Sequence, residues 1–288
     1  MKLVNDFKDY ELLDMANGEK LERWGKYYLV RPDPQVIWDK KSKPELWSKA
    51  DAKYFRSNTG GGKWEVYNKN LPNNWSIKYH DLVFNLKLMG FKHTGLFPEQ
   101  AYNWNIISEK IRNANREVKV LNLFAYTGGA SVAALSENAI VTHVDSSRGM
   151  VDWAKENVKS SKLSDREIHF IVDDCVKFVE REIRRGHKYD IIIMDPPSFG
   201  RGANKEVWQV EKDLYNLVSL CSKLLSDDPL MFLINSYTTG LSMTVLKDVM
   251  MLTIVPKYHG HIETDEVGIK MSNSELVLPC GIFARWEK

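Results

Sequence analysis

Most of this chain is predicted to adopt an α/β fold, and three observations support that class. From residue 98 onward, strand-like and helix-like segments alternate with short links, as in βαβ units of a parallel sheet covered on both faces. The last two strand-like segments leave no room for a helix between them, so at least one should be antiparallel. Residues 1–95 instead show short β-like runs broken by turn residues. We therefore predict a Rossmann-like, seven-stranded, mostly parallel sheet with helices on both faces in residues 96–288, and a small β-rich N-terminal domain in residues 1–95.

The N-terminal domain is expected to be mainly antiparallel, with β-like runs at 27–30, 35–38, 64–67 and 82–88. Residues 1–96 carry 17 Lys and Arg against 12 Asp and Glu, and six of the nine Trp precede residue 105. A basic, aromatic-rich segment suits nucleic acid, because bases stack on aromatic rings and phosphates attract cations. The alternative, which the usual burial of tryptophan favours, is that these residues build a small β core.

The C-terminal domain should begin with a helix, since Pro98 suits a first turn and Trp104, Ile107 and Ile111 follow at helical spacing. Five strands are expected at 118–124, 140–144, 168–172, 189–194 and 230–235. The helices that follow them are expected at 130–138, 149–160, 176–185, 206–225 and 241–251, and the two closing strands at 257–261 and 274–283.

Composition excludes several classes of protein. The 288 residues are 43% hydrophobic and 27% charged, with a formal net charge of +2, so disorder is excluded and a strongly basic domain is absent. The apolar stretches are too short to cross a bilayer and the charged N-terminal segment is unlike a signal peptide, so we expect a cytoplasmic protein without membrane contact. The three cysteines are widely spaced, and neither a disulfide framework nor a metal site is expected.

Ligands of open α/β sheets bind beyond the carboxyl ends of the strands, so each strand end is a candidate site. The first strand runs into residues 124–129 (FAYTGG), where Gly128 and Gly129 allow a tight turn and close approach of a ligand. The turn is neither GxGxxG nor GxxxxGK[ST], so it suits a nucleoside with a small zwitterionic tail better than a pyrophosphate. The alternative is an ordinary strand-to-helix turn.

Acidic residues follow the next two strands. Asp145 ends the second strand, where a carboxylate can accept both hydroxyls of a ribose. Asp173 and Asp174 follow the third strand, where an acid can accept from an adenine amino group. Each of these residues can instead cap the helix that follows. Together, a glycine turn at the first strand end and acids at the next two are nevertheless hard to explain by packing alone.

The fourth strand ends in residues 195–199 (DPPSF). Its two prolines stiffen the loop and remove two N–H donors, which leaves carbonyl groups and one carboxylate as acceptors. Such a loop suits a substrate nitrogen whose hydrogens are held while its lone pair faces an electrophile. A strand-terminating turn is the alternative.

In this order and spacing, the four strand ends resemble those of the class I S-adenosylmethionine-dependent methyltransferases, and most closely the large-subunit ribosomal RNA methyltransferases and their bacterial relatives. Residues 91–100 (FKHTGLFPEQ) resemble the segment that precedes the core in that group. The resemblance implies S-adenosylmethionine as cofactor, bound by Phe124, Tyr126, Thr127, Gly128, Asp145, Asp174 or Asp173, and Asp195. It also implies that the methyl-accepting atom is faced by the catalytic residues Asp195, Pro196 and Pro197.

The residue types at the strand ends restrict which kind of atom can accept the methyl group. Methylation at C5 of cytosine needs a cysteine nucleophile, and residues 234–239 (INSYTT), where the resembling C5 enzymes carry it, contain none. We therefore expect a base nitrogen in RNA, foremost ribosomal RNA, contacted by Ser198, Phe199 and Arg201. The alternatives are methylation of a protein or small molecule and a non-catalytic nucleic-acid-binding role. The missing GxGxxG disfavours a nicotinamide dehydrogenase.

Overall fold

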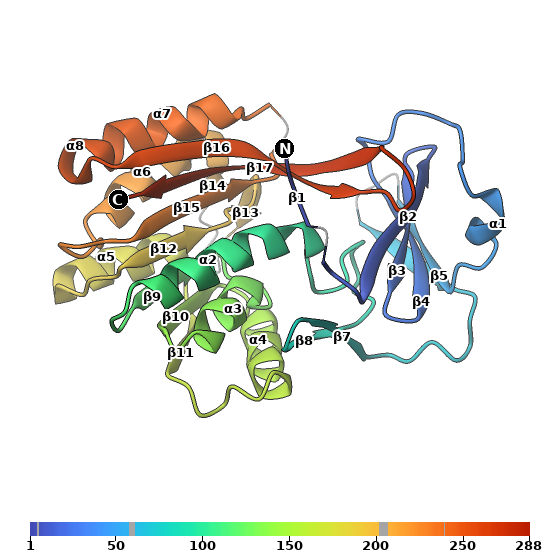
Figure 1. The fold of residues 1–288 in the computed structure, drawn as a ribbon, viewed down its shortest axis with the longest axis horizontal. Coiled ribbons are helices and arrows are strands. Elements are labelled where there is room, and N and C mark those ends of the chain that lie inside the picture. Colours follow the sequence, from blue (N-terminus) through green and yellow to red (C-terminus); the bar gives the residue numbers. More distant parts are fainter. Residues whose placement is uncertain (5, 58–60, 202–206, 239) are drawn as a thin grey trace. The chain divides into compact units, whose positions relative to one another are not determined.

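The computed structural model describes residues 1–4, 6–57, 61–201, 207–238 and 240–288. The chain forms two compact units (Figure 1). Unit 1 comprises Met1–Lys2, Tyr102–Val267 and Cys280–Lys288, and unit 2 comprises Leu3–Ala101 and Gly268–Pro279. Unit 2 therefore combines the N-terminal segment with a short segment from near the other end of the chain.

Unit 1 is built on a sheet with the strand order β1-β16-β17-β15-β12-β9-β10-β11. The five strands at the end of that order are parallel: β15 (Met231–Ser236), β12 (Ile191–Met194), β9 (Lys119–Leu123), β10 (Ile140–Asp145) and β11 (Ile168–Val172). They are followed outward from β15 by β17 (Val277–Glu287), which is antiparallel to it, then β16 (His261–Lys270) and β1 (Lys2–Leu3). The α/β class and the mostly parallel sheet are confirmed, with the short β1 as an eighth strand.

Helices cover both faces of this sheet. Strands such as β12 are therefore buried along their whole length. One group packs with the sheet in a continuous apolar core: α5 (Cys175–Arg185), α6 (Val210–Ser222), α7 (Met243–Thr253) and α8 (Val255–Tyr258). Figure 1 shows the other group on the opposite face: α2 (Ala101–Asn113), α3 (Gly129–Ser136) and α4 (Arg148–Ser160).

Two predicted elements of unit 1 were wrong in their bounds. Residues 207–209 are strand β14 (Val207–Gln209), paired with β13 (Phe199–Arg201), so the helix expected from residue 206 begins only at Val210. The strand expected at 257–261 was wrong: Lys257 and Tyr258 belong to α8, and β16 starts only at His261. In the first case pairing with a partner strand overrides the local pattern. In the second, Pro256 lies in the first turn of α8, a position that proline favours.

Unit 2 contains a five-stranded sheet in the order β2-β3-β4-β5-β6, in which only β4 and β5 pair in parallel. Its strands are β2 (Tyr10–Ala16), β3 (Glu19–Trp24), β4 (Tyr27–Pro32), β5 (Ala52–Arg56) and β6 (Gly62–Val66). The short helix α1 (Pro44–Trp47) and a β7–β8 hairpin (Trp75–Tyr79, Leu82–Leu86) complete it, after which η1 (Pro98–Gln100) leads into α2. The expected β-rich, mainly antiparallel region is confirmed, but the run expected at 35–38 was wrong, because those residues form no strand.

The tryptophans of unit 2 differ in burial. Trp24 is fully buried in the core, whereas Trp38, Trp47, Trp64 and Trp75 are half-buried. The indole N–H groups of Trp38 and Trp47 donate to the carbonyl of Met15 and to the carboxylate of Asp14, both at 2.8 Å. These bonds hold the two rings in place, so Trp24, Trp38 and Trp47 serve packing rather than a free stacking surface.

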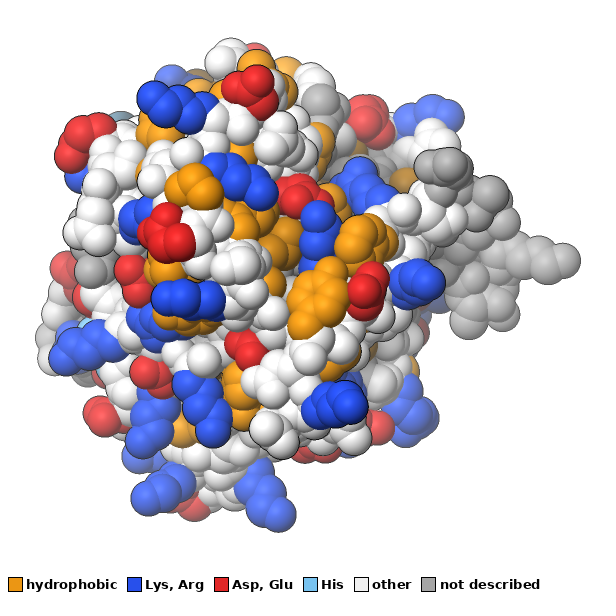
Figure 2. All heavy atoms as spheres, turned by 90° about the vertical axis from the view of Figure 1, so that its right-hand side faces the viewer, with side chains coloured by type: hydrophobic (Ala, Val, Ile, Leu, Met, Phe, Trp, Pro, Cys, Tyr) orange, Lys and Arg blue, Asp and Glu red, His pale blue; other side chains and the backbone are white. Residues whose placement is uncertain are grey.

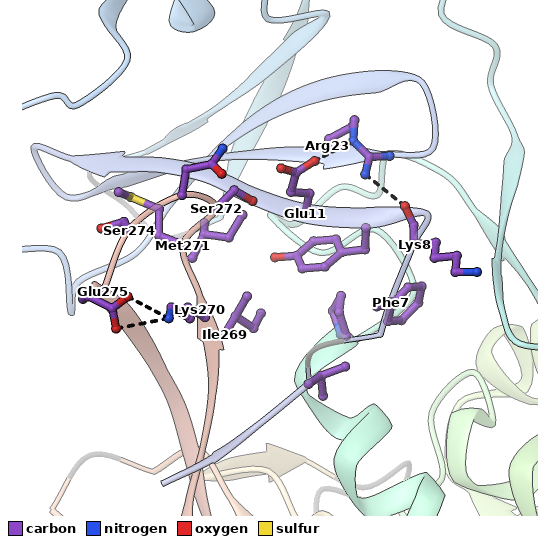
Figure 3. Close-up of a pocket in the computed structure, with 15 residues that line it drawn as sticks. Phe7, Lys8, Glu11, Arg23, Ile269, Lys270, Met271, Ser272, Ser274 and Glu275 are labelled. Carbon is purple, nitrogen blue, oxygen red and sulfur yellow. Dashed lines mark hydrogen bonds and ion pairs between the residues drawn. The ribbon is translucent and has the colours of Figure 1, made fainter.

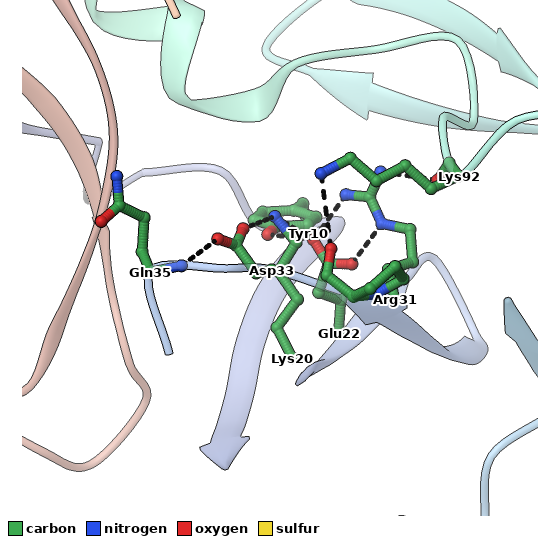
Figure 4. Close-up of polar contacts among 8 residues, drawn as sticks. Tyr10, Lys20, Glu22, Arg31, Asp33, Gln35 and Lys92 are labelled. Atoms are coloured by element: carbon green, nitrogen blue, oxygen red, sulfur yellow. Dashed lines mark hydrogen bonds and ion pairs between the residues drawn. The ribbon is translucent and has the colours of Figure 1, made fainter. Parts of the chain in front are cut away.

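An ion pair is buried in the same unit (Figure 4). The Arg31 guanidinium donates to both carboxylate oxygens of Glu22, at 2.6 and 2.7 Å, and the Tyr10 hydroxyl donates to Glu22 at 2.8 Å. Burial alone would raise the pKa of Glu22, but Arg31 and Lys20 lower it to about 2.

Candidate functional site

The carboxyl ends of β9, β10, β11 and β12 lie at one edge of the unit 1 sheet, because these strands are parallel neighbours. The loop after β9 is unusually tight. Phe124 and Tyr126 have positive φ angles of 52° and 50°, and Gly128, at +83°, precedes α3. Such angles are rare for aromatic residues and cluster at ligand sites.

Neighbouring helices approach the two glycines of this loop closely. A Cβ on Gly128 would lie 3.0 Å from the Cβ of Ala154, and one on Gly129 would lie 2.6 Å from Cζ2 of Trp104. The carbonyl of Thr127, which is buried, accepts a hydrogen bond from the amide of Asn157 at 2.8 Å. The two glycines therefore serve the packing of α2 and α4 against the loop as well as its turn.

Asp145 joins two of the strand-end loops. Its Oδ2 accepts from the backbone N–H of Tyr126 and its Oδ1 from that of Ser147, both at 2.8 Å. Burial raises the pKa of Asp145 above the usual value, and these two hydrogen bonds oppose that rise. Each carboxylate oxygen can accept more than one hydrogen bond, so both can still accept a ribose hydroxyl.

The two acids after β11 differ in their partners. Asp174 caps α5, because its side chain accepts a hydrogen bond from the N–H of Lys177 at 3.0 Å. The helix-cap role considered for this residue is therefore present. Asp173 uses both oxygens: Oδ1 accepts from the N–H of Asp174, and Oδ2 pairs with Arg181 at 2.7 Å. Asp174 is therefore the better candidate for an adenine amino group.

The Asp195-Pro196-Pro197 loop follows β12, and Met194 pairs directly with Leu123 of β9. The loop therefore starts beside the Phe124 loop. Pro196 is buried, Pro197 and Ser198 are exposed, and Phe199 is 53% exposed. The Ser198 hydroxyl lies 2.7 Å from that of Thr238, in the loop after β15. The side chain of Arg201 lies outside the described part of the chain.

Three residues that the sequence did not indicate also lie at this edge. Trp208 donates from its indole N–H to the carbonyl of Pro197 at 2.6 Å. The buried amide of Asn103, on α2, donates to the buried Asn235 near the end of β15 at 3.0 Å. No motif marks these residues, because their partners lie far away in sequence.

A cavity of about 730 Å³ lies elsewhere, within unit 2 (Figure 3). It is bounded by β2 and by the turn between β16 and β17, and four of its charged residues form pairs: Arg23 with Glu11 at 3.1 Å and Lys270 with Glu275 at 3.0 Å. Among the described residues, no group of three or more His, Cys, Asp or Glu is placed to hold a metal ion. No helix in that part of the chain is both long and apolar enough to span a membrane.

A family model described as S-adenosylmethionine-dependent methyltransferase matches residues 55–249. The chain belongs to this family. A SAM-dependent methyltransferase from Agrobacterium tumefaciens, known from a crystal structure, is 36% identical, with 99% of this chain and 92% of that one covered and a TM-score of 0.94. A methyltransferase crystallised with SAH is 19% identical, with 98% and 76% covered and a TM-score of 0.70, which is a likeness of fold.

The methyltransferase family also includes relatives with a named substrate. The ribosomal RNA large subunit methyltransferase K/L of Shewanella sp. (strain MR-4) is 37% identical over 146 residues, which are 50% of this chain and 20% of that protein. Its counterpart in Pseudoalteromonas atlantica is 38% identical over 144 residues, 49% of this chain and 19% of that protein. The chain thus spans about a fifth of the length of these relatives.

The family establishes this methyltransferase as an enzyme whose cofactor is S-adenosylmethionine. The chemistry of the sheet edge fits that cofactor. Asp145 offers two acceptor oxygens, and Gly128 turns the loop before α3. Residues 124–129 contain no Lys or Arg side chain of the kind that binds a pyrophosphate. The individual residue assignments remain predictions.

Proposed function

We propose that this methyltransferase transfers a methyl group to a nitrogen of a base in RNA, with ribosomal RNA as the expected substrate. The observation that carries the proposal is the pairing of Met194 with Leu123, which makes the Asp195-Pro196-Pro197 loop and the Phe124 loop neighbours. A loop rich in acceptors is then beside the loop assigned to the cofactor. The names of the ribosomal RNA relatives support RNA as the substrate.

Each loop has a separate task in this proposal. Phe124, Tyr126, Thr127 and Gly128 hold the methionine end of the cofactor, Asp145 the ribose and Asp174 the adenine. S-adenosylmethionine supplies an electrophilic methyl group on a sulfonium leaving group. Asp195 and the carbonyl of Pro196 accept hydrogen bonds from the substrate and orient its nitrogen lone pair. The carbonyl of Pro197 already accepts from Trp208, so its role is to hold the loop.

Two of the three cysteines favour nitrogen over C5 chemistry. Burial raises the pKa of the Cys175 and Cys221 thiols, and a buried neutral thiol is a poor nucleophile. Cys175 is further occupied by the N–H of Phe124, at 3.4 Å. Cys280 lies on β17 next to the end of β15, because Ile282 pairs with Ser236, so its position does not separate the two chemistries.

Exposed rings supply the substrate contacts in this proposal. Phe199, with Ser198 and Arg201, would contact the target base. In unit 2, Phe55 and Tyr67 are 38% and 48% exposed, and the exposed Lys63 is paired across the hairpin with Phe55. Figure 2 shows a face of the molecule on which Lys and Arg side chains lie, together with acidic ones, around hydrophobic side chains. We propose that unit 2 holds single-stranded RNA through these rings and cations.

Nucleoside mass spectrometry tests the substrate. Total RNA from cells with and without the gene is digested and compared, and one methylated base should be missing from the second sample. Adding the purified methyltransferase and S-adenosylmethionine to that RNA should restore the same nucleoside. An unchanged nucleoside profile would contradict RNA as the substrate and favour a protein or a small molecule.

A further inference from the structure

Trp208 lies at the junction of two strand-end loops of unit 1. It is the central residue of β14, opposite Gly200 of β13, and it is followed directly by Gln209 and α6. It is half-buried, and its ring packs against the apolar core of the unit.

The first contact of Trp208 holds the Asp195-Pro196-Pro197 loop. Neither proline has an N–H group, so the loop has few donors of its own. Hydrogen bonds to its carbonyl groups therefore come from other segments. The donors come from β14 and the start of α6: the indole N–H of Trp208 to the carbonyl of Pro197 at 2.6 Å, and the N–H of Val210 to the carbonyl of Ser198 at 3.1 Å.

The second contact reaches the loop after β9. The rings of Trp208 and Phe124 have centroids 5.4 Å apart and an interplanar angle of 48°, a tilted packing arrangement. Phe124 has a positive φ angle of 52°, and its N–H donates to the Cys175 sulfur at 3.4 Å. One side chain therefore touches both the loop assigned to the cofactor and the loop assigned to the methyl acceptor.

We propose that Trp208 is a positioning residue that sets the distance between these two loops. The inference rests on the proposed function. Transfer of a methyl group requires the attacking atom, the carbon and the leaving group to lie in line, so a small displacement of one loop lowers the rate while binding persists. The indole ring fixes the Phe124 side and the indole N–H fixes the Pro197 side.

Two substitutions separate the ring from its N–H group. Trp208→Phe keeps an aromatic ring and removes the donor. Trp208→His restores a donor, because Nε2 of imidazole occupies the same position in a five-membered ring as Nε1 of indole. Three measurements are made: the kcat and KM of methyl transfer into total RNA from cells lacking the gene, the Kd for S-adenosylmethionine by calorimetry, and amide hydrogen exchange of residues 195–201 without cofactor.

For Trp208→Phe we expect kcat to fall about tenfold while the Kd for S-adenosylmethionine changes by less than about threefold. Exchange at Ser198 and Phe199 should become faster. Trp208→His should recover part of both losses. Trp286→Phe is the control, because the indole N–H of the fully buried Trp286 also donates to a backbone carbonyl, that of His259. It should leave kcat and the exchange of residues 195–201 unchanged.

Unchanged kcat and unchanged exchange in Trp208→Phe would overturn the inference, as would an equal fall of kcat in Trp286→Phe. If the unsubstituted enzyme transfers no methyl group to RNA, the proposed function fails instead. The exchange measurement then still decides whether Trp208 holds the loop.

Discussion

Two carboxylates in this molecule, Glu22 in unit 2 and Asp145 in unit 1, show how surroundings decide the use of one chemical group. Glu22 is fully buried and receives a guanidinium and a tyrosine hydroxyl, so it is ionised with a permanent counter-charge. Among the residues that the structure describes, the partners of Asp145 are two backbone N–H groups and no cation, and burial raises its pKa. The comparison teaches that a paired acid is committed to structure, whereas an acid without a cation keeps acceptor capacity for a ligand.

Removing the cation of the structural pair should produce the largest effect. Arg31→Met strands the buried Glu22 carboxylate and is expected to lower the free energy of unfolding by about 3–5 kcal/mol, measured by urea denaturation. The double variant Glu22→Gln, Arg31→Met is the control and should recover much of that loss, because no unpaired charge remains. Equal stability of Arg31→Met and the unsubstituted protein would show that the pair is not structural.

At the sheet edge, the expected effect falls on the reaction. Asp195→Ala should lower the rate of methyl transfer by about a hundredfold or more, because the substrate loses an acceptor at the reacting atom. Its affinity for S-adenosylmethionine, measured by calorimetry, should stay nearly constant. A parallel loss of affinity and rate would mean that Asp195 supports the loop rather than the substrate.

Asp145→Ala tests the acid without a cation. It should weaken binding of S-adenosylmethionine by about 1–3 kcal/mol, since the ribose hydroxyls lose their acceptor. Asp152→Ala on α4 is a matched control, because that acid pairs with Lys155 at an exposed position. It should bind the cofactor normally. Calorimetry that finds the two variants alike would remove Asp145 from the site.

The pH dependence of stability should show the smallest effect. The folded pKa of Glu22, about 2, is below its ordinary value of 4.5, so its contribution is fully present above pH 4.5 and is lost as pH falls toward 2. The stability difference between the unsubstituted protein and Glu22→Gln should therefore shrink as pH is lowered below 4.5, as followed by denaturant unfolding. A difference that stays constant through this range would contradict the assigned pKa.

The strand-end residues could be predicted because alternating strands and helices imply a parallel sheet, and the carboxyl ends of parallel strands meet at one edge. That argument brings Phe124, Asp145, Asp174 and Asp195 together from local patterns alone. It could not find Trp208, because the local pattern predicts a helix from residue 206 onward. The strand conformation of residues 207–209 comes from pairing with residues 199–201, a contact that periodicity does not report.

Composition was equally limited in unit 2. Its basic, tryptophan-rich character was compatible with a stacking surface or a core. The structure buries Trp24 and holds the half-buried Trp38 and Trp47 by hydrogen bonds, so these three rings serve packing. Phe55 and Tyr67, whose rings are exposed, have no distinguishing sequence signal.

The fold class and the order of the acids along the sheet edge could be predicted from the sequence, because each follows from short-range patterning and from the geometry common to all parallel sheets. The folded chain was needed to show which acid has a cation beside it, which aromatic rings are buried, and which side chain contacts the proline loop. Those properties depend on contacts between residues that are far apart in the sequence, and these residues interact only after the chain has folded.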